Sequence, residues 1–345
     1  MSLLNILCII KYFASRKKKR YRSRCLRYAK HGWPAKLLPE SVSGSGTTTR
    51  RQRHGRGAMW QTSPVAPSAL IGVFAALFGL IIGSFLNVCI VRVPERKSIV
   101  MPASACPKCG AAIRPWDNIP VVSWLLLNGK CRSCTTKISA MYPIVELLTA
   151  VLFWACYYAF GLTTEALKWV IFSSLMIVLV FTDMRERILP DVVNYSGFAA
   201  GLLLSLITKP SDGTSLWLAN RMFDFPPPPP VLSLADALVG AAFGGGLLWL
   251  VAELYFRLRG REGMGFGDVK MMMMAGAFLG LKRTLLTILV GSVLGSVLGL
   301  AFMLARQKES DYELPFGSFL GMAAVLVMFF GTPVVNWYLS LMMVR

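Results

Sequence analysis

The sequence predicts an all-α polytopic membrane protein with about eight transmembrane helices and a small cytoplasmic zinc-binding loop domain. Two observations carry the membrane prediction. Of the 345 residues, 55% are hydrophobic and only 16% are charged, whereas about a quarter of the residues of an average soluble protein are charged. The apolar residues also gather in blocks of roughly 20 residues separated by short polar stretches, which is typical of membrane-spanning helices. The composition therefore argues against a soluble enzyme and against a disordered chain.

Eight apolar blocks are predicted to cross or enter the membrane. Several are shorter than the ~20 residues needed to span a bilayer alone. The shortest, residues 268–280, opens after a glycine-rich turn, so we expect it to be shielded by neighbouring helices or to begin within the membrane. The blocks cover residues 69–90, 142–160, 166–182, 192–207, 236–256, 268–280, 284–304 and 317–340.

The net charge of +20 is concentrated in one segment. Residues 1–58 hold 15 Lys and Arg residues and one acid, Glu40, which leaves a net charge of only +6 for the rest of the chain. We therefore expect no nucleic-acid partner and interpret residues 1–58 as a basic, disordered leader. Two alternatives remain open: an arm that binds anionic lipid or directs targeting, or an upstream stretch outside the mature protein, with Met59 as the true start.

The loop charges predict the orientation of the chain. The side that carries residues 92–141 holds 15 Lys and Arg residues, against 6 on the opposite side after Met59. The positive-inside rule makes the first side cytoplasmic. The expected parts after the leader are a first transmembrane segment at 59–91, a cytoplasmic loop at 92–141 and a membrane core at 142–345. In the core, 208–235 is an outer loop, and its five prolines, Pro226 to Pro230, favour a polyproline II spacer without chemistry of its own.

Four cysteines of the cytoplasmic loop have the spacing of a metal site. The loop reads Cys106-Pro-Lys-Cys109, then 21 residues, then Cys131-Arg-Ser-Cys134. Two CxxC pairs can surround a tetrahedral zinc ion, and four cysteine ligands leave no open position, so the predicted zinc is structural. Two disulfides are the alternative, which a reducing compartment disfavours.

Four acids stand at or inside the apolar blocks, where a charge is costly and therefore a candidate for function. Each has an ordinary explanation, such as a helix cap for Asp191 and Asp268, an interfacial ion pair for Asp183, or a contact with a neighbouring helix for Glu146. Asp183 and Asp268, however, both fall on the cytoplasmic side. Two carboxylates held close together share a proton, so one can activate a water while the other polarises a carbonyl. We interpret this pair as an aspartyl dyad that hydrolyses a peptide bond, beside glycines that let the backbone turn tightly and admit an extended peptide.

The motif Gly263-Met-Gly265-Phe-Gly267-Asp268-Val-Lys270 resembles the GxGD motif of bacterial type IV prepilin peptidases, a family of membrane aspartyl proteases. The resemblance extends over about residues 70–340. It includes Gly83-Ser-Phe-Leu-Asn-Val88, the cysteine loop with Asn118-Ile-Pro120 and Gly129-Lys130, and Tyr142-Pro143-Ile-Val-Glu146.

The resemblance implies a catalytic pair, Asp183 and Asp268. The expected supporting residues are Gly265, Gly267, Lys270, Asp191 and Glu146. It also implies cleavage of prepilins or pseudopilins after a glycine that joins a basic leader to an apolar helix. The implied enzyme lies in membrane lipid as a multi-pass protein of the bacterial inner membrane, with its active site at the cytoplasmic face. Many members also methylate the new N-terminus with S-adenosylmethionine, so we expect this second activity here.

The sequence departs from the family pattern at a few positions. Ser318 stands in Pro315-Phe-Gly-Ser318 where a second proline is common, and Met141 stands where a basic residue is common. We expect neither change to touch the dyad. Two alternatives from other classes remain: a proton-coupled transporter that uses the intramembrane acids as relay groups, and a zinc-knuckle scaffold without catalysis.

Overall fold

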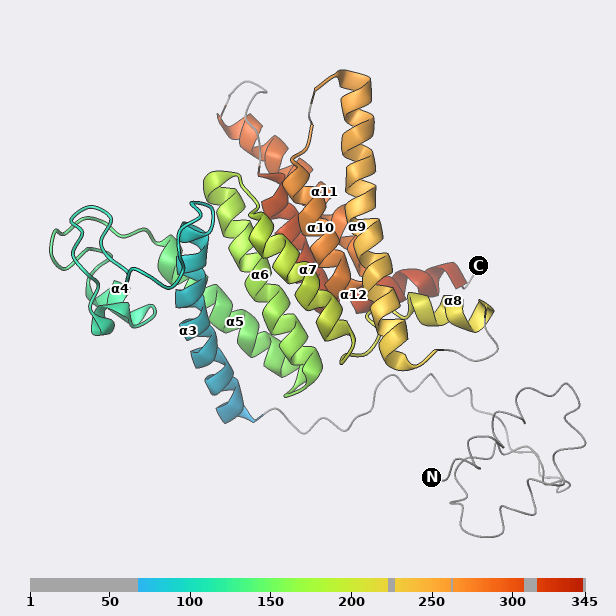
Figure 1. Cartoon of the computed structure of the whole chain (residues 1–345), viewed down its shortest axis with the longest axis horizontal. Helices are drawn as coiled ribbons and strands as arrows, with labels where there is room; N and C mark the ends of the chain where they lie inside the picture. Colours follow the sequence, from blue (N-terminus) through green and yellow to red (C-terminus); the bar gives the residue numbers. More distant parts are fainter. Residues whose placement is uncertain (1–67, 223–226, 262, 307–314, 344–345) are drawn as a thin grey trace, which may run out of the picture. The chain divides into compact units, whose positions relative to one another are not determined.

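The computed structural model describes residues 68–222, 227–261, 263–306 and 315–343 (Figure 1). The basic leader, residues 1–58, lies outside these ranges. The described residues are mostly helical, and the longest non-helical stretches lie in the loop between α3 and α5. The elements before the membrane core are α3 (Ala69–Arg92), the short 3-10 helix η1 (Pro115–Asn118) and α4 (Val122–Leu126). The core is formed by α5 (Met141–Phe160), α6 (Thr164–Glu186), α7 (Asp191–Ser205), α8 (Thr214–Met222), α9 (Pro229–Arg259), α10 (Phe266–Leu279), α11 (Leu281–Arg306) and α12 (Phe316–Met343).

Each of the eight apolar blocks forms a helix, but among the described residues six helices are long and apolar enough to cross a membrane. The six are α3, α5, α6, α9, α11 and α12. The other two, α7 and α10, have 15 and 14 residues. At 1.5 Å per residue they rise about 20 Å, which is less than the ~30 Å thickness of the hydrocarbon core. The predicted number of eight spans is therefore not confirmed.

Helix α10 lies at the centre of the bundle, as its short apolar block predicted. It packs against α6, α7, α9, α11 and α12, and its side chains from Met271 to Leu279 are almost all buried. A Cβ placed at Gly240 of α9 or at Gly276 of α10 would collide with the backbone of the other glycine. The two helices therefore touch backbone to backbone, a packing that small residues permit. A helix shielded on all sides does not need to reach both membrane surfaces.

The outer loop is more structured than the sequence suggested. It contains α8, and the proline run opens α9 instead of forming a rod, since Pro228 is the extended N-cap and Pro229 and Pro230 occupy the first turn. Proline suits this position because its φ is already helical and a first-turn residue needs no N–H.

This loop is also held by buried polar groups. Asp236 of α9, which is 1% exposed, accepts the backbone N–H groups of Gly213 and Ser215 at 3.1 and 2.7 Å. The Nζ of Lys168 donates to Ser211 Oγ at 2.9 Å. The interpretation of residues 208–235 as a simple spacer was wrong, because a loop that satisfies buried charges anchors the helices around it.

Candidate active site

Asp183 lies in the last turn of α6 and is buried, with 6% of its surface exposed. The helix ends because Arg187 adopts a left-handed conformation with φ of 55° and its N–H closes on the Asp183 carbonyl at 2.9 Å. The Asp183 side chain points towards α12. There its Oδ2 accepts the backbone N–H of Ser318 at 2.6 Å and the hydroxyl of Ser318 at 2.7 Å.

Asp268 lies in the first turn of α10 and is similarly buried, at 7% exposure. Gly265 caps this helix with φ of −67°, and the Asp268 N–H returns to its carbonyl at 3.1 Å. Neither Gly265 nor Gly267 has a positive φ. The described backbone at these two glycines does not require a left-handed conformation, and their lack of a side chain leaves space beside Asp268. A Cβ at Gly267 would stand 3.0 Å from Leu189 Cβ, while a Cβ at Gly265 would meet only Asp268 Oδ2 at 3.9 Å.

The two carboxylates, 85 positions apart in the chain, face a common point. A Cβ placed at Gly317 would stand 2.7 Å from Asp268 Oδ1 and 3.1 Å from Asp183 Oδ2. Asp183 is in α6, Asp268 in α10 and Gly317 in α12, and these three helices pack against one another. The two acids are thus placed where they could act on one bound group.

A cavity of about 270 Å³ opens beside the pair. It is lined by Asp183, Arg187, Ile188, Leu189, Asp191, Gly265, Gly267 and Asp268. A water and an extended backbone need a space of this kind next to the acids. The arrangement is therefore competent for general acid–base chemistry on a bound amide.

The structure brings most of the predicted supporting residues to this cavity. Gly265, Gly267 and Asp191 line it, and the Nζ of Lys270 is paired with Asp191 at 2.7 Å. Glu146 does not belong to this group. It is 7% exposed in α5, and its Oε2 accepts the backbone N–H of Val121 at 2.7 Å. Glu146 therefore connects the cysteine loop, residues 92–141, to the membrane helices and does not line the cavity beside the pair.

Ser318 is the residue that the sequence argument missed. The expectation that the departure at this position leaves the acids untouched is wrong, because both the N–H and the hydroxyl of Ser318 contact Asp183. Ser318 is 1% exposed and stands directly after Gly317. Its place in Pro315-Phe-Gly-Ser318 was visible in the sequence, but its proximity to Asp183 depends on how α12 packs against α6.

The four predicted cysteine ligands form one cluster in the loop between α3 and α5. All four sulfur atoms lie within 4.8 Å of one another, and Cys106 Sγ and Cys134 Sγ are 3.7 Å apart. Two sulfurs on a tetrahedral zinc at about 2.3 Å stand about 3.8 Å apart, so the donor set fits the ion. A hydrogen bond with the Thr136 hydroxyl lowers the pKa of Cys134 to about 6, while the pKa of Cys109 is raised to about 11 among its neighbouring cysteines. The cluster could hold a metal ion.

The two CxxC pairs have the same backbone arrangement. Antiparallel bridges flank each pair, between Ala105 and Ala112 in the first and between Lys130 and Lys137 in the second. Each second cysteine is followed by a residue with positive φ, +70° at Gly110 and 56° at Thr135. In each pair the N–H of that residue donates to the first cysteine's carbonyl at 2.9 Å. The local turns thus bring both cysteines of each pair to one side.

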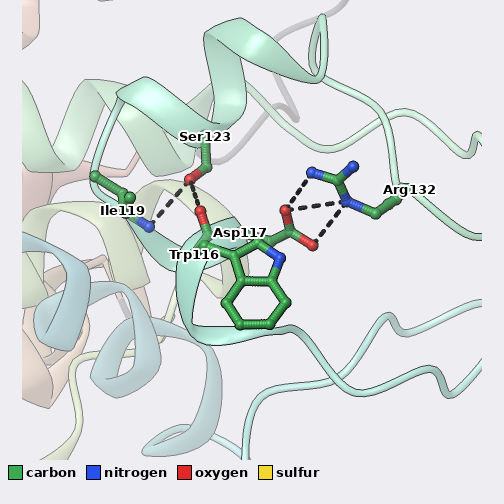
Figure 2. Close-up of polar contacts among 5 residues, drawn as sticks. All are labelled: Trp116, Asp117, Ile119, Ser123 and Arg132. Carbon is green, nitrogen blue, oxygen red and sulfur yellow. Dashed lines mark hydrogen bonds and ion pairs between the residues drawn. The ribbon is translucent and has the colours of Figure 1, made fainter.

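Polar contacts fix the rest of this loop around the second cysteine pair (Figure 2). Arg132 donates to both oxygens of Asp117, at 2.6 to 3.1 Å, and this guanidinium holds the pKa of Asp117 below its usual range. The Ser123 hydroxyl donates to the Trp116 carbonyl at 2.8 Å and accepts the Ile119 N–H at 3.0 Å. These bonds join η1 and α4 to the cysteine cluster.

Comparisons with known proteins place the chain in a family. Residues 77–160 match the family described as "Bacterial Peptidase A24 N-terminal domain", and residues 170–300 match the "Type IV leader peptidase family". The first range holds the four cysteines and the second holds Asp183 and Asp268. No solved structure gives a significant match.

Several curated relatives cover most of the chain, and each is named "Prepilin leader peptidase/N-methyltransferase". The relative from Pseudomonas aeruginosa is 37% identical over 290 residues, which is 76% of this chain and 92% of that protein. The relative from Xanthomonas campestris is 34% identical over 288 residues, with 77% and 93% covered. The relative from Aeromonas salmonicida is 33% identical over 291 residues, with 76% and 92% covered. With such identity over three quarters of its length, the chain belongs to the type IV leader peptidase family.

Proposed function

We propose that this chain is a bifunctional prepilin leader peptidase and N-methyltransferase of the bacterial inner membrane. Its family and the name of its relatives support both activities. The observation that carries the peptidase activity is the buried pair Asp183 and Asp268, whose carboxylates face one point beside a cavity. Its substrates are type IV prepilins or pseudopilins, cut after a glycine between a basic leader and an apolar helix.

Peptide hydrolysis by this pair needs one ionised and one protonated carboxyl group. The ionised group takes a proton from a water, and the water oxygen bonds to the scissile carbonyl carbon while the protonated group gives its proton to the carbonyl oxygen. The C–N bond then breaks, the departing amine takes the proton held by the first carboxyl group, and the second regains a proton from the collapsing diol. Both carboxyl groups return to their starting states.

We assign the active site to the cytoplasmic face. Asp183 is in the last turn of α6 and Asp268 in the first turn of α10, and the neighbouring loops carry basic residues, among them Arg187 and Arg261. Loops rich in Lys and Arg remain on the cytoplasmic side. In this orientation a substrate helix can remain in lipid while its leader and scissile bond reach the cavity.

The metal that we assign to the four cysteines is zinc. Four thiolates complete a tetrahedral shell, so the ion would hold the loop together and would not bind a substrate water. For methylation we assign S-adenosylmethionine as the methyl donor, on the relatives' name alone. The proton-coupled transporter is not favoured by the family match, and Glu146, which it would use as a relay, is bonded to Val121.

A cleavage assay in detergent or lipid tests the peptidase. A prepilin with an intact leader is incubated with the wild-type chain, Asp183→Asn or Asp268→Asn, and the mass of the product is measured. Asp236→Asn is the matched control, since Asp236 is an equally buried carboxylate in the outer-loop network. We expect wild type and the control to remove the leader and both dyad variants to fail while folded. Cleavage by either dyad variant would refute the assignment. In a parallel reaction with S-adenosylmethionine added, an extra methyl mass on the product would establish the second activity.

A further inference from the structure

The two carboxylates of the pair have unequal surroundings. Asp183 Oδ2 accepts two hydrogen bonds from one residue, the N–H and the hydroxyl of Ser318, at 2.6 and 2.7 Å. Within the part of the chain that the structure describes, no hydrogen bond reaches the Asp268 side chain. Hydrogen bonds donated to a carboxylate stabilise its charged form over its neutral form. The negative charge of the pair is therefore better placed on Asp183.

Helix α12 presents Ser318 to the pair. The helix begins at Phe316, so Ser318 lies in the first turn, where the helix dipole favours a negative charge. Its N–H is shared between Asp183 Oδ2 at 2.6 Å and the Pro315 carbonyl at 3.2 Å. The close approach depends on Gly317, because a Cβ there would stand 2.7 Å from Asp268 Oδ1 and 2.9 Å from Leu189 Cδ1. Glycine leaves room for the acids, and the serine after it supplies both donors.

Two other charged residues, Asp191 and Arg187, also line the cavity. Asp191 of α7 is paired with Lys270 of α10 at 2.7 Å. Arg187 lines the cavity at the end of α6, and its described hydrogen bond to Asp183 runs from its backbone N–H to the backbone carbonyl. Ser318 itself gives two hydrogen bonds to Asp183.

We propose that Ser318 is a positioning residue that holds Asp183 as the ionised member of the pair, so that Asp183 is the base that activates water and Asp268 is the acid that protonates the carbonyl oxygen. This inference rests on the proposed peptidase function. A negative charge on Asp183 in turn keeps the proton on Asp268. The Ser318 hydroxyl also lies 3.2 Å from the Val180 carbonyl. When Asp183 takes the proton of the attacking water, the Ser318 hydroxyl can turn to the Val180 carbonyl. The hydroxyl then has an acceptor whether Asp183 is ionised or protonated.

The test compares variants at position 318 in the prepilin cleavage assay, with kcat and KM measured separately. Ser318→Ala and Ser318→Gly both keep the backbone N–H and remove the hydroxyl, and Ser318→Thr keeps the hydroxyl. The matched control is Ser173→Ala, since Ser173 is fully buried in α6 and its hydroxyl donates to its own helix at Val170. Thermal unfolding shows which variants are folded.

Loss of one bond to a charged group is worth at least about a tenfold factor. We therefore expect Ser318→Ala and Ser318→Gly to lower kcat about tenfold or more with KM within about twofold, and Ser318→Thr to restore most of kcat. Ser173→Ala should leave both constants unchanged. If the folded Ala or Gly variants keep kcat within about twofold, change KM alone, or lose no more than Ser173→Ala, Ser318 has a packing role and the inference fails. Failure of the function itself looks different: the wild type would not cleave, or Asp183→Asn would still do so.

Discussion

Glu146 and Val121 join the cysteine loop to the membrane bundle. The carboxylate of Glu146 in α5 accepts the N–H of Val121 at 2.7 Å, and Val121 has a positive φ of 60° immediately before α4. A Cβ at Gly83 of α3 would stand 2.7 Å from Glu146 Cα, so α3 and α5 meet closely beneath this bond. An acid that the sequence suggested as support for catalysis thus fixes the position of the loop.

Replacement of Glu146 by leucine should loosen the loop. The Val121 N–H then has no acceptor, at a cost of about 1–3 kcal/mol, so amide hydrogen exchange at residues 119–124 should speed up markedly. Glu146→Gln keeps an acceptor oxygen and serves as the control, with exchange close to wild type. Equal protection in wild type and Glu146→Leu would show that the bond does not hold the loop.

Gly317→Ala should inactivate the peptidase without unfolding it. The added Cβ would stand 2.7 Å from Asp268 Oδ1 and 3.1 Å from Asp183 Oδ2, so one carboxylate must move. A small displacement of a reacting group costs about 100-fold in rate, which kcat in the cleavage assay measures. Gly246→Ala is the matched control, because a Cβ there has nothing within 4 Å. Full activity in folded Gly317→Ala would contradict the geometry of the pair.

The cysteine cluster should bind one zinc ion per chain. Metal analysis of the purified protein should give about one equivalent, and Cys106→Ser or Cys131→Ser should lower that value strongly, since each removes one of four ligands. Cys89→Ser, outside the cluster, should leave the zinc content unchanged. Chelation should also expose residues 105–137 to protease. Full zinc content in both ligand variants would exclude this site.

Arg132→Ala should speed the release of metal to a chelator at neutral pH, because Arg132 connects Asp117 to the second cysteine pair (Figure 2). The guanidinium lowers the pKa of Asp117. The stabilisation that the Asp117–Arg132 pair gives the loop is therefore present above the ordinary carboxyl pKa of about 3.9. It is lost as the pH falls through the lower pKa of Asp117 in the folded protein. The difference in release rate between wild type and variant should thus persist unchanged between about pH 7 and 6. Lys97→Ala, which breaks an exposed pair with Glu95, is the control, and equal rates in wild type and Arg132→Ala would contradict this role.

Asp236→Ala should lower stability more than it lowers activity. The N–H groups of Gly213 and Ser215 lose a buried acceptor, at about 1–3 kcal/mol for each group, so the unfolding temperature should fall clearly. Glu253→Ala breaks an exposed ion pair with Arg257 and should change stability by less than about 0.5 kcal/mol. Similar unfolding temperatures in the two variants would mean that the outer network is not stabilising.

The sequence by itself determined the local features of this protein. Eight apolar blocks predicted eight helices because hydrophobic length is a property of neighbouring residues. The spacing of Cys106, Cys109, Cys131 and Cys134 predicted the metal cluster because short turns decide which way each pair points. The GxGD-like motif and Asp183 predicted the acidic pair through chemistry and family resemblance.

Only the tertiary structure decided which distant residues meet. It placed the short α10 at the centre of the bundle with the short α7 packed against it, and it moved Glu146 from the acidic pair to the loop. It also brought Ser318 to Asp183 across 135 residues of chain. The physical reason is that such contacts depend on how α6, α10 and α12 pack side by side, and helix packing is set by the combined surfaces of several helices and not by any one segment.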